Sequence, residues 1–278
     1  MTEQIIKHYV NYDEEGRLFR DKAHLPEYLT TIRYFDRLFS PGSRILDACA
    51  GTGRYSFYLA DKGHIVTACD LTPHHVNIIR TNPDAIKLAD TAVCNVLDLS
   101  RFEIDSFDVV LCMGAMYHLS SDDEKIKAIR ECTRVCKPCG IVALSYLNYF
   151  AVVAAEVKPG LGDLSETLAD FEDGSDCLWK ATTPAKMEGY VKEAGLEIVH
   201  NIGADGISFV IADKVNAATD EDFEKWMEYI YKHCEEPSIL GYNLRIQYAW
   251  SVDREETRVK KDMPCVAACS YRYAFLQR

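Results

Sequence analysis

Five short apolar runs alternate along the first half of the chain with segments whose apolar residues recur at helical spacing. The runs are Arg44–Cys49, Ile65–Leu71, Thr91–Leu97, Phe107–Met113 and Gly140–Leu147. Runs of this length, rich in apolar and β-branched residues, predict buried strands. Strands alternating with helices predict a parallel sheet with helices on both faces. The pattern therefore indicates an α/β protein built on a doubly wound, mostly parallel sheet.

Residues at the ends of the intervening segments mark helix boundaries. Gly63 follows the helical pattern of Tyr55–Asp61, and glycine readily adopts the left-handed conformation that ends helices. Ser121 and Glu124 have the spacing of a capping box, which predicts the start of a helix directly after the fourth strand.

The first 40 residues lie outside this alternation. Residues 1–40 predict an N-terminal helical cover, in which the amphipathic pattern of Leu25–Leu38 is expected to pack over the ligand edge of the sheet. We expect the main domain at residues 41–255 and a C-terminal tail at residues 256–278.

Two further segments interrupt the main domain. Residues 149–182 are acidic and contain proline and several glycines, which predicts a long connection. Residues 204–243 lie between strands predicted near Glu197–Ile202 and Leu244–Val252, and their amphipathic pattern predicts a C-terminal helical insertion. This lid-like insertion could close over the site, and the alternative is a plain packing helix.

Composition narrows the classes of partner. The chain has 278 residues, with 43 acidic and 31 basic side chains and a net charge of −12. No Lys/Arg cluster stands out, so a nucleic-acid partner is not expected. There is no basic start followed by an apolar run, and no apolar stretch near the roughly 20 residues that span a bilayer, so we expect a cytoplasmic protein without a membrane partner. The 11 cysteines are scattered through predicted strands and helices, where reduced cysteine packs as a small hydrophobe.

A glycine loop after the first strand carries the strongest chemical signal. Asp47 ends the apolar run, and Gly51 and Gly53 follow it. Such a loop lets the backbone approach a nucleoside-type ligand, and the carboxylate favours a ligand with an ammonium group over a phosphate. A dinucleotide fingerprint would need a third glycine at position 56, where Ser56 stands. The loop therefore predicts an ammonium-bearing nucleoside.

Three cysteines offer a competing interpretation. Cys132, Cys136 and Cys139 have the C-x3-C-x2-C spacing of iron-sulfur ligands in radical S-adenosylmethionine enzymes. The first two continue the apolar stripe of Ile126 and Ile129 at helical spacing, so we expect them to point into the core. We predict no metal site.

Four motifs in order resemble those of class I S-adenosylmethionine-dependent methyltransferases. They are Asp47-Ala-Cys-Ala-Gly-Thr-Gly-Arg54, Asp70 ending the second strand, Asn95-Val96 ending the third, and Phe107-Asp-Val-Val-Leu-Cys-Met-Gly-Ala-Met-Tyr-His118 in the fourth. The resemblance covers about residues 5–255 and implies a Rossmann-like, seven-stranded sheet. It is closest to small-molecule enzymes of unassigned substrate.

The resemblance implies S-adenosylmethionine as cofactor and a set of residues that bind it. Asp47 would receive the ammonium, Asp70 the ribose hydroxyls and Asn95 the adenine amino group. The full set is Asp47, Ala48, Gly51, Gly53, Arg54, Asp70, Leu71, Asn95, Val96 and Met113. Asp70 and Asn95 could instead be turn residues at strand ends.

The reaction asks for alignment of the acceptor and, where needed, removal of its proton. His118 is the candidate general base, because it follows the fourth strand at the edge where ligands bind and has a suitable pKa, although it could be an ordinary helix-start residue. Tyr117 could orient the substrate. In the N-terminal cover, the rings of Tyr9, Tyr12 and Tyr28 could stabilise the sulfonium, and Arg17 could pair with a substrate carboxylate. Tyr12, Arg17 and Tyr28 are the candidate substrate-binding residues.

The expected function is methyl transfer to a small-molecule nucleophile by a monomer or homodimer. The fourth strand lacks an Asn/Asp-Pro-Pro-Tyr sequence, which lowers the expectation of nucleic-acid or protein N-methylation. A non-catalytic S-adenosylmethionine-binding protein and an enzyme that methylates protein or RNA are the alternatives.

Overall fold

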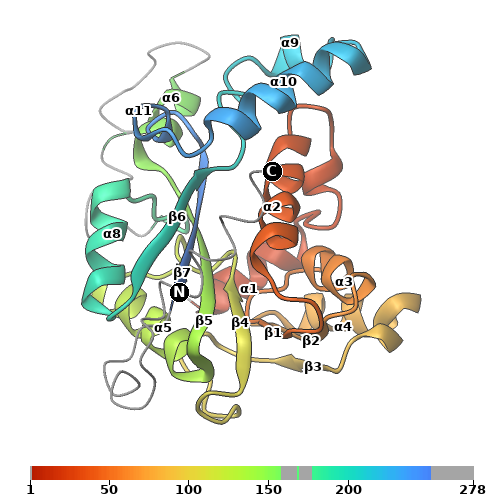
Figure 1. The fold of residues 1–278 in the computed structure, drawn as a ribbon, viewed down its shortest axis with the longest axis vertical. Helices are drawn as coiled ribbons and strands as arrows, with labels where there is room; N and C mark the ends of the chain where they lie inside the picture. Colours follow the sequence, from red (N-terminus) through yellow and green to blue (C-terminus); the bar gives the residue numbers. More distant parts are fainter. Residues whose placement is uncertain (1, 158–167, 169–176, 252–278) are drawn as a thin grey trace, which may run out of the picture.

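The computed structural model describes residues 2–157, 168 and 177–251, so the predicted tail at 256–278 lies outside the described residues. Within them, seven strands form one sheet in the order β3-β2-β1-β4-β5-β7-β6 (Figure 1). The strands are β1 (Arg44–Asp47), β2 (Ile65–Asp70), β3 (Asp90–Val93), β4 (Phe107–Cys112), β5 (Cys136–Leu147), β6 (Glu197–Gly203) and β7 (Arg245–Ser251).

Neighbouring strands from β3 to β5 pair in parallel, whereas β7 is antiparallel to both β5 and β6. The expected Rossmann-like α/β fold with a mostly parallel sheet is confirmed. The strand predicted at Thr91–Leu97 ends earlier, at Val93, because Asn95 opens a turn by accepting the Leu97 N–H at 2.9 Å.

Helices and short 3-10 turns surround the sheet. Before β2 lie α1 (Thr2–Val10), η1 (Arg17–Phe19), α2 (Leu25–Leu38) and α3 (Arg54–Asp61). Between β2 and β6 lie α4 (Pro73–Thr81), η2 (Pro83–Lys87), α5 (Asp122–Val135), α6 (Tyr149–Glu156) and α8 (Pro184–Glu193). The connection from β6 to β7 contains α9 (Ala212–Asn216), α10 (Asp220–His233) and α11 (Pro237–Leu240).

Both faces of the sheet are buried, and β1 contributes side chains to the core on each face. Leu46 packs in the cluster that includes Ile129 of α5, whereas Ile45 packs in the opposite cluster with Phe35 of α2 and Leu59 of α3. All five side chains are at most 4% exposed. Alternate residues of a strand point to opposite faces, so a continuous apolar run is what a central parallel strand requires.

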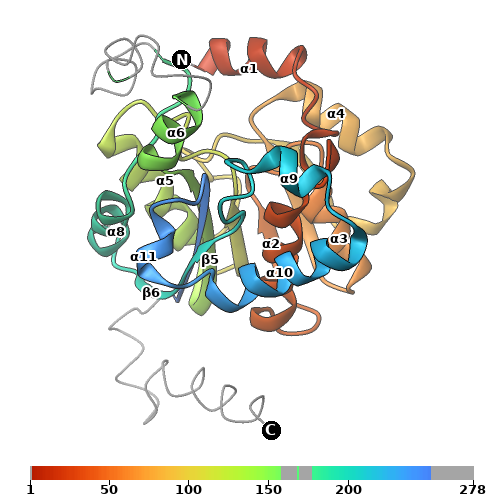
Figure 2. The same cartoon turned by 90° about the horizontal axis from the view of Figure 1, so that it is seen from above.

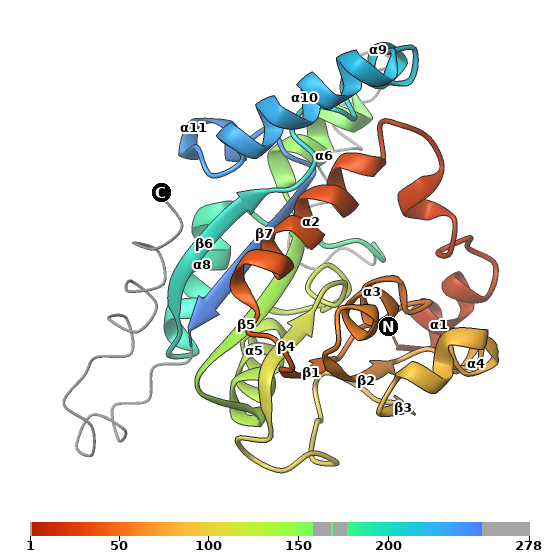
Figure 3. The same cartoon turned by 45° about the vertical axis from the view of Figure 1, so that its right-hand side comes forward.

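The placement expected for Leu25–Leu38 is wrong. Phe35 of α2 packs on the face of the sheet rather than over the ligand edge, and α1 lies in a different part of the molecule (Figure 2). The apolar stripe of α2 has a sheet face to cover, which gives more burial than an edge offers. On its other side, Tyr34 packs with Met227 and Ile230 of α10, which crosses α2 in Figure 3.

The helix boundaries follow the sequence signals. The Ser121 side chain accepts the Glu124 N–H at 3.2 Å, and the Glu124 carboxylate accepts the Ser120 N–H at 2.7 Å. Gly63 after α3 has φ +85°. Across the part of the chain that the structure describes, no helix is long and apolar enough to cross a membrane.

The cysteines largely behave as predicted. Cys132 is buried in α5 and Cys136 is buried at the first position of β5, so both belong to the core. Most described cysteines are free thiols, but Cys139 is disulfide-bonded, so the expectation of reduced cysteines is wrong there. Among the described residues, no group of His, Cys, Asp and Glu could hold a metal ion.

Candidate functional site

A cavity of about 650 Å³, its open mouth included, lies at the carboxyl ends of β1, β2 and β4. Ligands in open α/β sheets bind at this edge, where the strand order reverses on either side of β1. Its walls come from the loops after these strands and from α1. The lining residues that the following argument uses are Tyr9, Glu14, Gly51, Asp70, His75, Asn95, Val96, Met113, Tyr117 and His118.

The glycine loop after β1 forms one wall. Gly51 has φ +53° and lines the cavity, with the side chain of Glu14 beside it. Gly53 has φ +91°, and a Cβ there would lie 2.9 Å from a ring carbon of Phe57. Gly53 therefore shapes the loop from behind, while Gly51 leaves backbone open to a ligand.

Asp47 lies behind this loop and does not line the cavity. Its carboxylate is 1% exposed and accepts a hydrogen bond from the Ser56 hydroxyl at 2.6 Å. Burial raises the pKa of Asp47 to about 7, although the Ser56 hydrogen bond lowers it. A side chain so placed can act on a ligand through the loop or through a bridging water.

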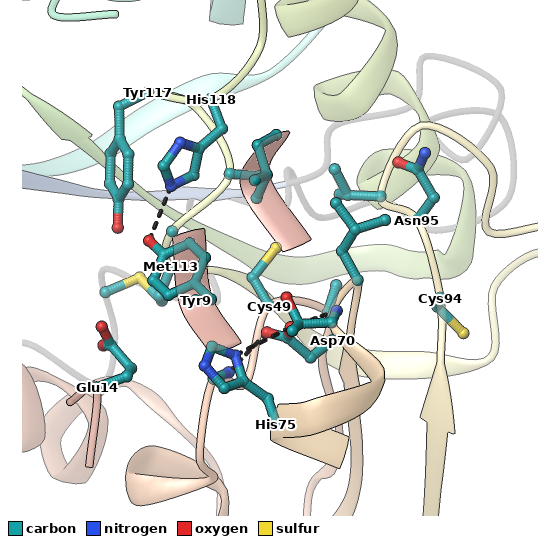
Figure 4. A pocket seen from close by; sticks show the side chains of 18 of the residues that line it. Tyr9, Glu14, Cys49, Asp70, His75, Cys94, Asn95, Met113, Tyr117 and His118 are labelled. Carbon is teal, nitrogen blue, oxygen red and sulfur yellow. Dashed lines mark hydrogen bonds and ion pairs between the residues drawn. The ribbon is translucent and has the colours of Figure 1, made fainter. Parts of the chain in front are cut away.

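Asp70 lines the cavity and is already extensively hydrogen-bonded (Figure 4). Oδ2 accepts the Gly51 N–H at 2.9 Å, and Oδ1 accepts the Thr72 N–H at 2.7 Å. The Nδ1 of His75 lies 3.2 Å from the same Oδ1. The carboxylate thus ties the glycine loop to the start of α4.

The third-strand residues lie beside Asp70 in the wall. Asn95, Val96 and Leu71 line the cavity, as does Met113 after β4. Asn95 Oδ1 already accepts the Leu97 N–H at 2.9 Å, so the turn interpretation holds, while the amide can still bond a ligand.

His118 lines the cavity beyond the end of β4, next to Tyr117. Its Nδ1 lies 3.1 Å from the Leu178 carbonyl oxygen, and its Nε2 lies 2.8 Å from the Tyr9 hydroxyl. A carbonyl oxygen only accepts, so Nδ1 carries the proton and Nε2 accepts from the Tyr9 hydroxyl. The imidazole is therefore held as the tautomer that a general base needs, with its Nε2 lone pair accepting the Tyr9 hydroxyl at the cavity wall.

Aromatic rings surround this base. The rings of Tyr117, Trp179 and Tyr9 have centroids 4.7 Å, 4.7 Å and 5.5 Å from that of His118. Close packing of this kind fixes the imidazole and excludes water from it.

Several predicted site residues lie elsewhere. Arg54 stacks on Phe19 and donates to the Glu15 carbonyl oxygen. Tyr12 stacks on His8, and Tyr28 stacks on Tyr55.

Arg17 does not line the cavity, because its guanidinium is occupied. It donates to both carboxylate oxygens of Glu27 and to Glu14. Burial lowers the pKa of Arg17, but the two carboxylates outweigh this and hold it well above its usual value. Arg17 therefore fixes Glu14, a lining residue, rather than binding a ligand itself. None of residues 204–243 lines the cavity either.

The sequence interpretation did not select the lining residues Ile5, Glu14 and His75, among others, and it named Tyr9 only as an aromatic ring that could stabilise the sulfonium. Ile5 and Tyr9 are the buried positions of α1, which is only nine residues long. Their i, i+4 spacing was the available signal, but so short a stripe is weak.

Comparisons with known proteins agree with this geometry. A family described as "Methyltransferase domain" matches residues 45–140. The chain is 31% identical over 173 residues to a ubiquinone biosynthesis O-methyltransferase of Xanthomonas euvesicatoria, a match that covers 62% of this chain and 68% of that protein. A Xanthomonas oryzae protein of the same name is 37% identical over 163 residues, which cover 58% of this chain and 66% of the relative.

A solved structure extends the likeness of fold over most of the chain. A SAM-dependent methyltransferase from Thermotoga maritima has a TM-score of 0.55 at 15% identity, covering 91% of this chain and 100% of that one.

Proposed function

This chain belongs to the class I S-adenosylmethionine-dependent methyltransferases, and on that premise we propose that it methylates a hydroxyl group of a small molecule. S-adenosylmethionine is the cofactor, and it supplies a sulfonium methyl group that is already activated for in-line displacement. The protein must then hold the acceptor in line and take its proton.

The residues of the glycine-loop wall fit this cofactor. Gly51 would present backbone without a Cβ to the methionine portion, and Asp70 would accept hydrogen bonds from the ribose. Asn95 and Val96 would hold the adenine ring, and Leu71 and Met113 line the same cavity. Ala48 also lines the cavity, whereas Gly53 and Arg54 shape the loop without lining it.

Asp47 supplies the charge that selects an ammonium group. Its carboxylate is buried directly behind the loop, where an ionised oxygen is poorly solvated. An ammonium on the other side of the loop offsets that cost, directly or through one water, whereas a phosphate increases it.

The observation that carries the choice of acceptor is the hydrogen bond from Tyr9 to His118. Nε2 already receives the O–H of Tyr9, another lining residue, at 2.8 Å, which is the geometry of a base taking a hydroxyl proton. We propose that an acceptor hydroxyl takes the place of the Tyr9 hydroxyl on Nε2, and that Tyr117 orients it. The names of the curated relatives, O-methyltransferases, support a hydroxyl acceptor.

Other features support a small acceptor rather than a macromolecule. The net charge of −12 opposes binding of a phosphate backbone. The segment 1–40 covers the cavity through α1 and Glu14, while Tyr12, Arg17 and Tyr28 stabilise that cover instead of touching the substrate.

The test is formation of S-adenosylhomocysteine, followed by mass spectrometry, with a panel of phenolic and aliphatic hydroxy compounds and the matching amines. Turnover with hydroxy compounds, lost in His118→Asn while S-adenosylmethionine affinity is unchanged, is the expected result. Asparagine can still donate to the Leu178 carbonyl oxygen from near the Nδ1 position, so it removes only the base. His74→Asn, at an exposed position of α4, is the matched control.

Cofactor binding without turnover on any acceptor would instead indicate a binding protein. Turnover on amines alone, or full activity in His118→Asn, would contradict the proposal.

A further inference from the structure

His75 is a buried histidine in the cavity wall for which the proposed mechanism has no use. It lies in the first turn of α4, is 3% exposed and has one ring nitrogen 3.2 Å from Asp70 Oδ1. Its other nitrogen, Nε2, is buried and finds no hydrogen-bond partner among the residues that the structure describes. A buried polar atom without a partner is rare, and at a cavity wall it indicates a ligand contact.

The tautomer of His75 follows from its partner. A carboxylate accepts hydrogen bonds and does not donate them, so Nδ1 carries the proton that points to Asp70. Nε2 of the neutral ring then presents a lone pair, and it suits a hydroxyl donor. In Figure 4 this nitrogen points away from Asp70.

Asp70 itself has too little free capacity for two hydroxyl groups. Each carboxylate oxygen offers about two acceptor sites. Oδ1 has both filled, by the Thr72 N–H and by His75 Nδ1–H. Oδ2 accepts the Gly51 N–H, which leaves one site. A vicinal diol needs one more acceptor than Asp70 provides.

We propose that His75 Nε2 accepts one hydroxyl of the cofactor's ribose while Asp70 Oδ2 accepts the other. His75 is thus a second ribose-binding residue. It follows Asp70 in the chain, and the Asp70 carboxylate orients its ring. This inference rests on the proposed placement of the cofactor ribose at Asp70.

The alternative is that His75 only holds Asp70 in place. Two substitutions separate these roles, because each keeps one end of the imidazole. In His75→Asn the side-chain amide can still donate to Asp70 from near the Nδ1 position, but nothing reaches the Nε2 position. In His75→Gln the longer side chain carries its amide to the Nε2 position and gives up the contact with Asp70.

The experiment is calorimetric titration of S-adenosylhomocysteine and its 2′-deoxy and 3′-deoxy analogues into the full chain and both variants. In the wild type, loss of the hydroxyl that His75 accepts should weaken binding by about fivefold, the usual effect of one neutral hydrogen bond. Loss of the hydroxyl that Asp70 accepts should weaken it by about tenfold or more, because the acceptor is charged. In His75→Asn one of the two analogues should bind as well as S-adenosylhomocysteine, to within twofold, while the other keeps its full loss. His75→Gln should retain part of the discrimination that His75→Asn loses.

Full losses for both analogues in His75→Asn would overturn the inference, as would near-wild-type binding in His75→Asn with strong loss in His75→Gln. Absence of S-adenosylhomocysteine binding to the wild type would count against the proposed site as a whole, so the two failures are distinguishable. Exposed His74→Asn is the control for effects of the helix start. If His75→Asn does not fold, equal binding of all three ligands to the wild type is the overturning result.

Discussion

At the scale of single residues, Asp47 combines a cost in stability with a role in binding. The carboxyl is buried and its pKa is raised to about 7, so the folded state holds this proton more tightly than the unfolded state does. Its contribution to stability is full below about pH 4 and is lost as the pH rises to about 7. A neutral, isosteric side chain avoids that loss.

Asp47→Asn should therefore be more stable than the wild type at pH 8 by about 2–4 kcal/mol, with little difference near pH 4. Urea unfolding without ligand at a series of pH values measures the difference. The same variant should bind S-adenosylmethionine at least tenfold more weakly at pH 8, because the ammonium loses its counter-charge. A pH-independent difference in stability would show that the carboxyl does not titrate with a raised pKa.

The Tyr9 hydroxyl and His118 share one hydrogen bond but should differ in catalytic importance. Tyr9→Phe removes only the hydroxyl, and if an acceptor hydroxyl replaces it on Nε2, kcat should fall by less than about tenfold. Loss of the base in His118→Asn should lower kcat by about 100-fold or more. Steady-state kinetics on the identified acceptor compares the two. Equal losses would mean that the proton passes through the Tyr9 hydroxyl.

At the scale of elements, the glycines before and after β1 differ in what surrounds them. Gly42 and Gly53 both have positive φ, +72° and +91°. A Cβ at Gly42 meets nothing within 4 Å, whereas one at Gly53 lies 2.9 Å from Phe57 and 3.1 Å from Ile79.

Gly42→Ala should thus cost only the backbone penalty, about 1–2 kcal/mol, with unchanged cofactor affinity. Gly53→Ala should cost more than Gly42→Ala in urea unfolding and should also weaken binding of S-adenosylhomocysteine, because the loop must move away from Phe57. Equal effects of the two substitutions on both measurements would show that the loop tolerates the added methyl group.

Elements also show why part of the site was hidden in the sequence. Asp70 ends β2 and His118 follows β4; both strands are apolar runs with clear ends, and their order alone places both residues at one edge of the sheet. Leu25–Leu38 was identified correctly as a helix, but an amphipathic stripe does not say which surface it covers. The actual cover, α1, has two buried residues in nine, a pattern too short to recognise.

The hydrogen-bond and ion-pair partners of individual side chains were the hardest features to predict from the sequence. Arg17 has the residue type of a carboxylate-binding group, and its commitment to Glu27 and Glu14 depends on the path of the chain between α1 and α2. The role of His75 likewise depends on the start of α4 turning the ring back to Asp70. Such contacts are set by tertiary packing, which no local pattern encodes.

At the scale of the whole molecule, thermal stabilisation by different ligands can show which class of ligand the cavity binds. The cavity joins the ends of β1, β2 and β4 with α1, so a ligand that fills it bridges segments far apart in the chain. A ligand that binds only the folded state stabilises it by RT ln(1 + [L]/Kd), about 2.7 kcal/mol at 100 times Kd. For a domain of this size that corresponds to a rise in Tm of roughly 5–10 °C.

S-adenosylhomocysteine should produce this rise in thermal unfolding, whereas NADH at the same concentration should produce less than about 1 °C. Both ligands contain adenosine and differ beyond it: S-adenosylhomocysteine carries an amino-acid chain with an ammonium, and NADH a pyrophosphate joined to a second nucleoside. The buried carboxylate of Asp47 behind the loop disfavours the pyrophosphate by electrostatics. Asp47→Asn should lower the rise in Tm caused by S-adenosylhomocysteine and increase the rise caused by NADH. Equal stabilisation of the wild type by NADH would mean that the loop recognises adenosine alone and that Asp47 does not select the cofactor.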